Sequence, residues 1–172
     1  ILAERMGIPV VHMEAGNRCF DLKVPEEVNR RVIDAVSSFN LPYTPQSKQN
    51  LIREGFPSNR IVLTGNPIYE VLQHYEPDVM NSSILEQLQL TEKQYFLVTI
   101  HRSENVDDPA QLAEIVKGLS LIADAFRMRL ICSTHPRTYS KLTKEMLDQV
   151  NPLVEFHEPF GFFDFVRLEK AA

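Results

Sequence analysis

The fold of this chain is decided by residues 8–16, which read IPVVHMEAG. Residues 8–13 form a largely apolar run between Gly7 and Gly16, and a run of this length fits a β-strand that is buried on both faces of a sheet. The run ends at Glu14, just before the glycine turn. Because active sites of open α/β sheets lie at the carboxyl ends of the strands, the sequence predicts Glu14 at a functional edge.

A second acidic motif follows at residues 25–30, which read PEEVNR. Proline is favoured at the first position of a helix, so Glu26 and Glu27 are expected in a first helical turn. Carboxylates that converge near one strand end suit chemistry that removes a proton from one face of a substrate and returns it on another. A structural role is the alternative, because Glu14 could pair with Arg18 and first-turn acids stabilise a helix N-terminus.

Composition limits the kind of protein. The chain has 172 residues, 44% hydrophobic and 24% charged, which fits one ordinary globular domain or parts of two. The formal net charge of -5 argues against a nucleic-acid partner, and no apolar stretch reaches the roughly 18 to 20 residues of a membrane helix. Cys19 and Cys132 show no metal-ligand spacing, so we expect free thiols in a reducing cytoplasm.

Both ends of the sequence have the pattern of interrupted elements. Residues 1–6 fit the last turn of a helix that Gly7 closes, and residues 163–172 follow a helical pattern without a cap. We therefore expect the sequence to be part of a longer protein.

Strand and helix patterns alternate along the chain. Further strands are expected at residues 39–44, 60–64, 95–100, 129–133 and 153–156. Helices are expected at residues 26–37, 45–53, 68–75, 109–126 and 140–150, the first with Val28, Val32, Ile33 and Val36 aligned on one face. Residues 76–90 are polar and have the character of a connector. This alternation predicts an α/β fold of parallel βαβ units.

Three expected strands of the second half end in polar clusters that contain His101, His135 and His157. If these strands are parallel neighbours, the histidines share one sheet edge with Arg102 and Arg137. Histidine and arginine at such an edge can hold an anionic ligand, and arginine binds phosphate with two parallel hydrogen bonds. The alternative for each cluster is an ordinary surface loop that binds no ligand.

Several other chemistries lack their sequence patterns. No two histidines have metal-ligand spacing on one element, so no metal site is predicted. The chain contains no P-loop, no GxGxxG and no GxSxG, which argues against an NTPase, a dinucleotide enzyme and a serine hydrolase of the α/β type.

The motifs HMEAGNR, VPEEVNR, LTGNP, TIHRSENVD and STHPRT occur in this order and together resemble the non-hydrolysing UDP-N-acetylglucosamine 2-epimerase family. The resemblance runs through essentially the whole chain. It implies a GT-B-like fold with two Rossmann-like parallel-sheet domains, both incomplete in this sequence. Residues 1–66 would be the later part of the N-terminal domain, residues 67–93 a linker, and residues 94–172 the earlier part of the C-terminal, UDP-binding domain.

The resemblance also implies the reaction. Such enzymes invert C-2 of a UDP-activated N-acetylhexosamine: UDP leaves with loss of the C-2 proton, and it adds back to the 2-acetamidoglycal after reprotonation on the opposite face. No cofactor is implied, and the complete protein is expected to be a homodimer. Acid/base groups near the sugar and cationic groups near the diphosphate are what this chemistry requires.

By position in the motifs, Glu14, Glu26 and His101 match catalytic residues of the family, with His101 near the diphosphate. Glu27 is the adjacent alternative to Glu26. The remaining substrate-binding candidates are Arg18, Arg102, Glu104, His135, Arg137 and Phe160. Phe160 fits either the uracil pocket or an ordinary aromatic core.

Two departures from the family pattern qualify this interpretation. Further functional residues of the family lie beyond both ends of this sequence, so we expect the isolated chain to be inactive. The stretch HMEAGNRCFD is closer to the branch that makes UDP-N-acetyl-L-fucosamine, which leaves a 6-deoxy-L-talose substrate as an alternative. A GT-B glycosyltransferase and an inactive UDP-sugar-binding protein are the rival functions.

Overall fold

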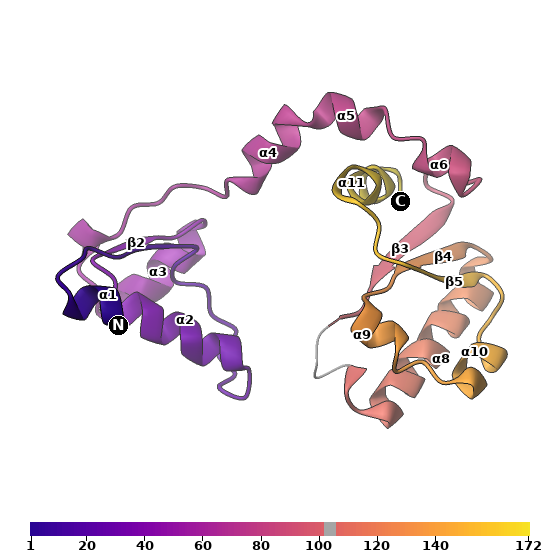
Figure 1. Ribbon diagram of the computed structural model, residues 1–172, viewed down its shortest axis with the longest axis horizontal. Helices are drawn as coiled ribbons and strands as arrows, with labels where there is room; N and C mark the ends of the chain where they lie inside the picture. Colours follow the sequence, from indigo (N-terminus) through magenta and orange to yellow (C-terminus); the bar gives the residue numbers. More distant parts are fainter. Residues whose placement is uncertain (102–105) are drawn as a thin grey trace. The chain divides into compact units, whose positions relative to one another are not determined.

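The computed structural model describes residues 1–101 and 106–172. The chain divides into two compact units, Ile1–Gln73 and His74–Ala172. Each unit holds one sheet, and every strand pair in both sheets is parallel. The expected α/β class with two parallel-sheet units is confirmed (Figure 1).

The first unit is a short parallel sheet with helices. Strands β1 and β2 pair so that Val11 lies opposite Phe39 and His12 opposite Asn40. Leu51 and Ile61 form a small apolar core with Ala15. The elements are α1 (Leu2–Arg5), β1 (Val11–Met13), α2 (Pro25–Val36), β2 (Phe39–Leu41), α3 (Pro45–Arg53), η1 (Ser58–Arg60) and α4 (Ile68–His74).

Two expected strands of this unit differ in the structure. β1 starts only at Val11, and Val11 and Met13 are 52% and 56% exposed, so the expectation of a strand buried on both faces is wrong. The physical reason is that the face of β1 carrying His12 contacts α2 through Asp34, whereas Val11 and Met13 point to the opposite, exposed face. The strand expected at residues 60–64 is reduced to a single bridge between Asn40 and Ile61.

Helix α2 has the expected bounds within a residue but an unexpected orientation. The apolar residues Val28, Val32 and Ile33 are each more than 40% exposed. The face that packs inward carries Glu27 and Asp34, both fully buried. The interior of the first unit beneath this helix is therefore polar.

The second unit is built on a three-stranded sheet in the order β3-β4-β5. Tyr95 lies opposite Arg129, and Leu130 opposite Val154, so the three strands run in step. The elements are α5 (Glu76–Met80), α6 (Ile84–Gln87), β3 (Tyr95–Thr99), α8 (Pro109–Phe126), β4 (Arg129–Ser133), α9 (Pro136–Tyr139), α10 (Lys144–Gln149), β5 (Val154–His157) and α11 (Phe162–Ala171).

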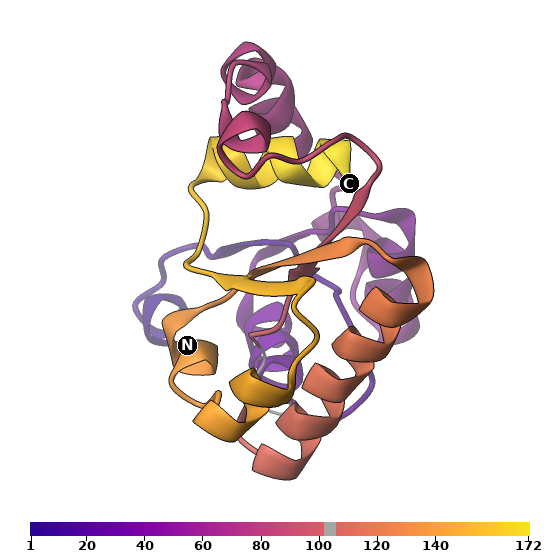
Figure 2. The same ribbon diagram turned by 90° about the vertical axis from the view of Figure 1, so that its right-hand side faces the viewer.

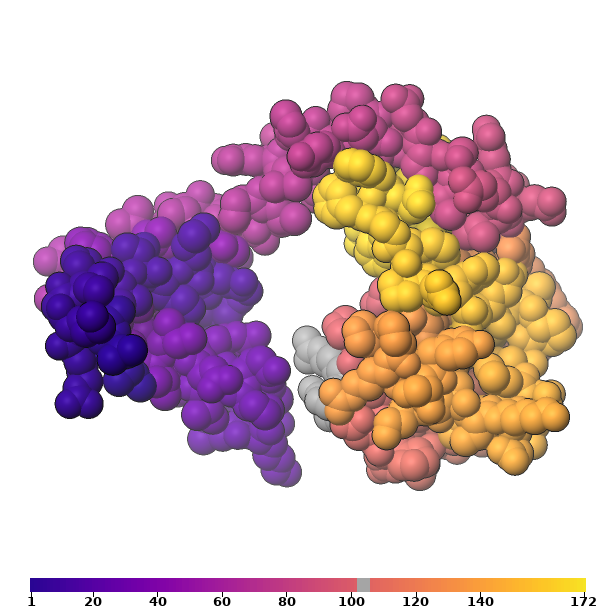
Figure 3. Space-filling view, in the orientation of Figure 1, coloured from indigo at the N-terminus to yellow at the C-terminus, as the bar shows by residue number. Residues whose placement is uncertain are grey.

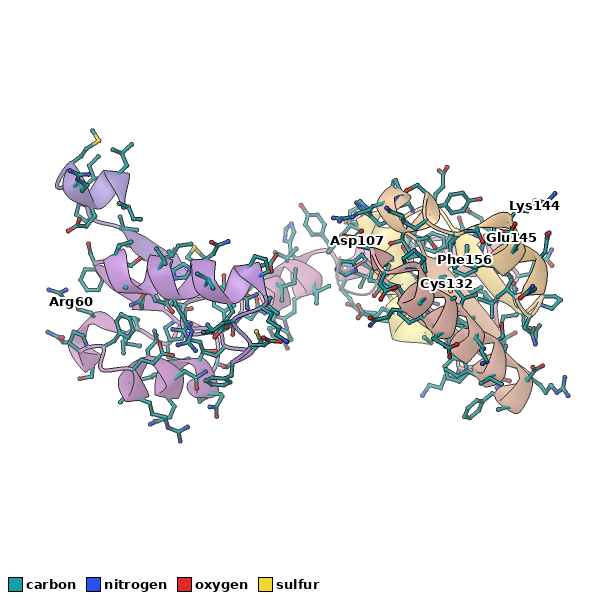
Figure 4. All side chains as sticks on the ribbon, turned by 90° about the horizontal axis from the view of Figure 1, so that it is seen from below. Arg60, Asp107, Cys132, Lys144, Glu145 and Phe156 are labelled. Carbon is teal, nitrogen blue, oxygen red and sulfur yellow. The ribbon has the colours of Figure 1, made fainter. Side chains whose placement is uncertain are left out.

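Helices cover both faces of this sheet, α8 on one side and α11 on the other (Figure 2). On the α8 side, Leu130 and Cys132 pack with Leu119. On the α11 side, Ile131 packs with Leu168. Successive residues of β4 thus alternate between the two layers, as the two-residue period of a strand requires. Cys132 and Phe156 lie inside the unit, as Figure 4 shows.

The expected connector at residues 67–93 is largely helical, and from His74 onward it belongs to the second unit. Helices α5 and α6 pack against α11 (Figure 3). Ile84 and Leu85 enter the same core cluster as Tyr95 and Leu168. A polar segment forms helices here because a helix far along the chain, α11, covers its few apolar side chains. Within the described ranges, no helix combines the length and apolar character needed to cross a bilayer.

Candidate active site

Glu14 lies at the carboxyl end of β1 with an unusual backbone. Its φ is +65°, in the left-handed region that costs a non-glycine residue roughly 1–2 kcal/mol. The side chain is exposed, and Asn17 Nδ2 donates to its Oε1 at 2.7 Å. Strain of this kind persists only where surrounding contacts determine the backbone, and it is typical of functional sites.

Helix α3 supplies one set of those contacts. Gly16 has a φ of +77°, and a Cβ at this position would lie 2.2 Å from the Ser47 carbonyl oxygen. Asn50 Nδ2 donates to the Gly16 carbonyl at 3.0 Å, and Ser47 Oγ donates to Asn17 Oδ1 at 3.0 Å. Only glycine fits this close approach of the turn to the helix.

Helix α2 supplies the other set through Asp34, which is fully buried. Asp34 Oδ1 lies 2.6 Å from His12 Nδ1. Asp34 Oδ2 accepts from the Gly16 amide at 3.2 Å and from an Arg18 Nη at 2.7 Å. The carboxylate therefore contacts both sides of the Glu14 turn.

Arg18 is engaged inside the first unit. It donates to both carboxylate oxygens of Glu54 and to the Asn17 carbonyl as well as to Asp34. The hydrogen bond to Glu54 is the largest cause that raises the pKa of Arg18 above its ordinary value and lowers that of Glu54. Arg18 thus pairs with Asp34 and Glu54, and not with Glu14 as the structural alternative from the sequence had it.

The paired acids of α2 have different environments. Glu26 is exposed in the first turn. Glu27 is fully buried, with its carboxylate accepting from the Cys19 amide at 3.0 Å and from Arg31 Nε at 2.9 Å. Burial alone would raise the pKa of Glu27, but these hydrogen bonds outweigh it and lower the pKa. Glu26 is thus the solvent-facing member of the pair, and Glu27 an internal one.

The second unit brings its histidines to one edge, as the sequence predicts for parallel neighbours. His101 follows β3, His135 follows β4, and His157 ends β5. His135 Nδ1 accepts from the Arg137 amide at 3.2 Å, and the Arg137 guanidinium pairs with Asp107. Arg102 and Glu104, also candidates, lie outside the described residues.

A cavity of about 460 Å³ lies beside the ends of β4 and β5. Phe160 is not one of its lining residues: its ring lies 5.5 Å from that of His157, and its side chain packs against the core under α11. The cavity is lined by Thr134, Pro136, Tyr139, Ser140, Phe156, Glu158 and Pro159. Its mixture of aromatic and polar groups is typical of a small-molecule site.

His12 and Asp34 are the residues of this site that sequence reasoning missed. The signal was present in the spacing of α2, because Glu27 and Asp34 are seven residues apart and Arg31 lies between them at a helical interval. The prediction for this helix followed the apolar face formed by its valines and not the polar face on the opposite side. Among the described residues, no cluster of three histidine, cysteine or acidic side chains could hold a metal ion.

The fold and the polar groups at its strand ends define a parallel α/β protein of the GT-B-like class, with acidic groups on the first unit and histidines on the second. The family model described as UDP-N-acetylglucosamine 2-epimerase matches residues 1–172. The chain belongs to this family.

Individual relatives agree with the family. The UDP-N-acetylglucosamine 2-epimerase of Methanocaldococcus jannaschii is 36% identical over 178 residues, which cover 100% of this chain and 49% of that protein. Its crystal structure in complex with UDP-GlcNAc and UDP matches with a TM-score of 0.89 and 35% identity, over 99% of this chain and 48% of that one.

The structure of the UDP-N-acetylglucosamine 2-epimerase from Rickettsia bellii matches with a TM-score of 0.84 and 37% identity, over 99% of this chain and 45% of that one. The chain thus spans about half the length of the relatives it matches.

Proposed function

We propose that the complete protein is a non-hydrolysing UDP-N-acetylglucosamine 2-epimerase, an isomerase that interconverts UDP-GlcNAc and UDP-ManNAc. The C-2 proton leaves the sugar while the bond from C-1 to the UDP oxygen breaks, which gives a 2-acetamidoglycal and UDP. A proton then returns to C-2 on the opposite face as UDP adds back to C-1. Family membership supports this assignment over transfer to an acceptor or binding without turnover.

The observation that carries the proposal is the Glu14 turn. Glu14 presents an exposed carboxylate at the end of β1, and two helices hold the adjoining Gly16 backbone through buried hydrogen bonds. A left-handed backbone alone does not distinguish Glu14, because Phe20, Gln89, Lys93 and Arg127 also have positive φ values. What distinguishes Glu14 is its place at a strand end, beside a glycine packed against a helix carbonyl.

We assign proton transfer to Glu14 and Glu26 and place His101 beside the diphosphate. His135, Arg137 and Phe160 are assigned to the nucleotide side, together with Arg102 and Glu104. The edge position of the three histidines and the adjoining cavity support this side of the assignment.

Arg18 and Glu27 have a different place in the proposal. Both were candidates for substrate contact, but each forms ion pairs with other residues of the first unit. We assign them to holding the site together rather than to the sugar.

The proposal includes a homodimer in the cytoplasm with a UDP-sugar as its small-molecule partner. The two free cysteines agree with a reducing compartment. Light scattering of the complete protein measures the dimer directly.

The decisive experiment follows C-2 deuterium by NMR in D2O with the complete protein. UDP-GlcNAc should incorporate deuterium at C-2 and yield the manno epimer. The 6-deoxy-L-talose analogue, run separately, tests the other branch by its relative rate. Tight UDP binding without exchange in either sugar would overturn the epimerase proposal.

A substitution tests the role of Glu14. Glu14→Gln should lower the rate at least about 100-fold, typical of a removed acid/base group, while UDP affinity and melting temperature stay close to those of the parent. The matched control is Glu114→Gln, because Glu114 is 76% exposed and lies 3.8 Å from Lys117 on the surface of α8. Near-normal turnover of Glu14→Gln would show a purely structural role.

A further inference from the structure

Asp34 is a buried carboxylate that the proposed chemistry does not use. It lies in α2, is fully buried, and is held by three polar groups. Burying a carboxylate is costly unless it is paired, and well-packed apolar residues often serve stability equally well. The residue therefore needs a reason beyond stability.

The partners of Asp34 bracket Glu14 in the sequence. His12 lies two residues before Glu14, Gly16 two residues after it, and Arg18 four residues after it. The corresponding distances from the carboxylate are 2.6 Å, 3.2 Å and 2.7 Å. One side chain thus fixes the backbone on both sides of the strained residue, so it constrains where the Glu14 carboxylate points.

Helix α2 connects this clamp to the second acid. Glu26 stands in its first turn and Asp34 in its last turns. Eight residues of α-helix span about 12 Å with little freedom to bend. A helix clamped at Asp34 to the Glu14 turn therefore also sets the position of Glu26 relative to Glu14.

The contacts around Arg18 show which of its two acidic partners fixes the Glu14 turn. Asp34 and Glu54 both accept hydrogen bonds from Arg18, but only Asp34 among these two also binds His12 and the Gly16 amide. Glu54 accepts from Nε of Arg18 and shares Nη2 with Asp34, but it does not touch residues 12–16 through any hydrogen bond described for it. The two acids are thus a natural test and control.

We propose that Asp34 is a positioning residue for the epimerisation, which sets Glu14 and Glu26 at their working separation through His12, the Gly16 amide and Arg18. This inference rests on the proposed function, since it names what the clamp is for. Asp34 itself stays away from the sugar and exchanges no proton with it.

The first variant to test is Asp34→Asn in the complete protein. The amide has the shape of the carboxylate but turns one acceptor into a donor, which must then face the Gly16 amide and Arg18 or His12. Misplacement of a catalytic group by about 1 Å costs up to about 100-fold in rate, so we expect kcat to fall about 10- to 100-fold with KM changed less than about threefold. Glu54→Gln, the control, should keep kcat within about threefold, because it leaves the turn contacts in place.

His12 provides a second test that does not depend on the folding of Asp34→Asn. The side-chain amide of asparagine can place a donor where Nδ1 of His12 lies, without any counterpart of Nε2. His12→Asn should therefore retain most of the activity that His12→Ala loses. Equal loss in both variants would mean that His12 acts through Nε2, and it would overturn the positioning role assigned to this contact.

A direct structural readout completes the experiment. The NMR amide signals of Ala15 and Gly16 should shift in Asp34→Asn and stay near their parental positions in Glu54→Gln. If the parent protein exchanges deuterium at C-2 and Asp34→Asn matches its kcat, the positioning proposal fails while the epimerase proposal stands. If the parent protein shows no exchange with either sugar, the proposed function fails and takes this inference with it.

Discussion

The two units of this chain have interiors of opposite character. Beneath α2, the first unit buries Glu27, Asp34, Asn40, Ser47 and Asn50 around a small apolar cluster. The second unit buries mainly apolar side chains in layers on both faces of its sheet. Hydrogen bonds are directional and apolar contacts are not, so the first unit holds one turn in one geometry, whereas the second provides a stable platform.

The difference shows how an acidic site can be made rigid. A strained residue such as Glu14 needs neighbours that specify its position, and buried hydrogen-bonded groups do this at some cost in stability. At the strand ends of the second unit the histidines follow regular strands, and Thr138 Oγ1 donates to the Ile100 carbonyl at 2.8 Å.

The largest effect that tests this contrast between the two units is expected at Gly16. Gly16→Ala should lower the free energy of unfolding by roughly 2–5 kcal/mol, the sum of a left-handed backbone and overpacking against α3. The expected clash is with the Ser47 carbonyl oxygen at 2.2 Å. Denaturant unfolding of the complete protein measures the change.

Gly118 is the matched control in the second unit. It lies within α8, and a Cβ there would meet no described atom within 4 Å. Gly118→Ala should raise the free energy of unfolding by up to about 1 kcal/mol through helix propensity. Equal effects at the two glycines would remove the distinction between a tightly specified turn and a tolerant helix.

A smaller effect is expected on acidification. The pKa values of Glu27 and Glu54 lie below the ordinary 4.5. Each therefore stabilises the fold fully above pH 4.5, and this contribution is lost as the pH falls through the lowered folded value. Amide hydrogen exchange should show the first unit losing protection first as the pH falls below that point.

In the second unit, the ion pair to compare with these acids is Arg129–Glu155. It also lowers the pKa of its acid, but both side chains are 30% exposed whereas Glu27 is fully buried, so solvent screens this pair more than the contacts of Glu27 and its loss should matter less. Simultaneous loss of protection in both units would contradict the assignment of acid sensitivity to the polar interior.

The smallest effect concerns the thiols. Burial raises the pKa of Cys132 to about 12, whereas Cys19 is exposed. An alkylating reagent at pH 8 should therefore modify Cys19 and leave Cys132 intact until the protein unfolds, because the thiolate is the reactive form. Peptide mass spectrometry checks this, and labelling of native Cys132 would show that the apolar layer opens readily.

Local patterns predicted the regular elements well. The starts of α2, α3 and α8 follow from Pro25, Pro45 and Pro109 at their first positions, and the parallel strand pairing follows from the alternation of strands and helices. The Glu14 position at a strand end could be read because Gly16 marks the turn.

The features that local patterns did not predict depend on contacts between residues far apart in the sequence. The apolar face of α2 predicted the wrong inward side, because the partner of that helix is a polar turn and not an apolar sheet. The helices α5 and α6 could not be predicted, since their stability comes from α11 far along the chain. The clamp at Asp34 depends on residues up to 22 positions apart, which local periodicity does not report.

The packing of α11 has a consequence for synthesis on the ribosome. Leu168 and Ala171 complete the core cluster around Tyr95 and Ile131, and Lys93 donates its amide to the Ala171 carbonyl at 2.7 Å. While the nascent chain grows, Ile84 and Leu85 of α6 can cover only part of this face of the second sheet until α11 emerges. Incompletely covered apolar strands are aggregation-prone, so the folding of the second unit is tied to the emergence of its last helix.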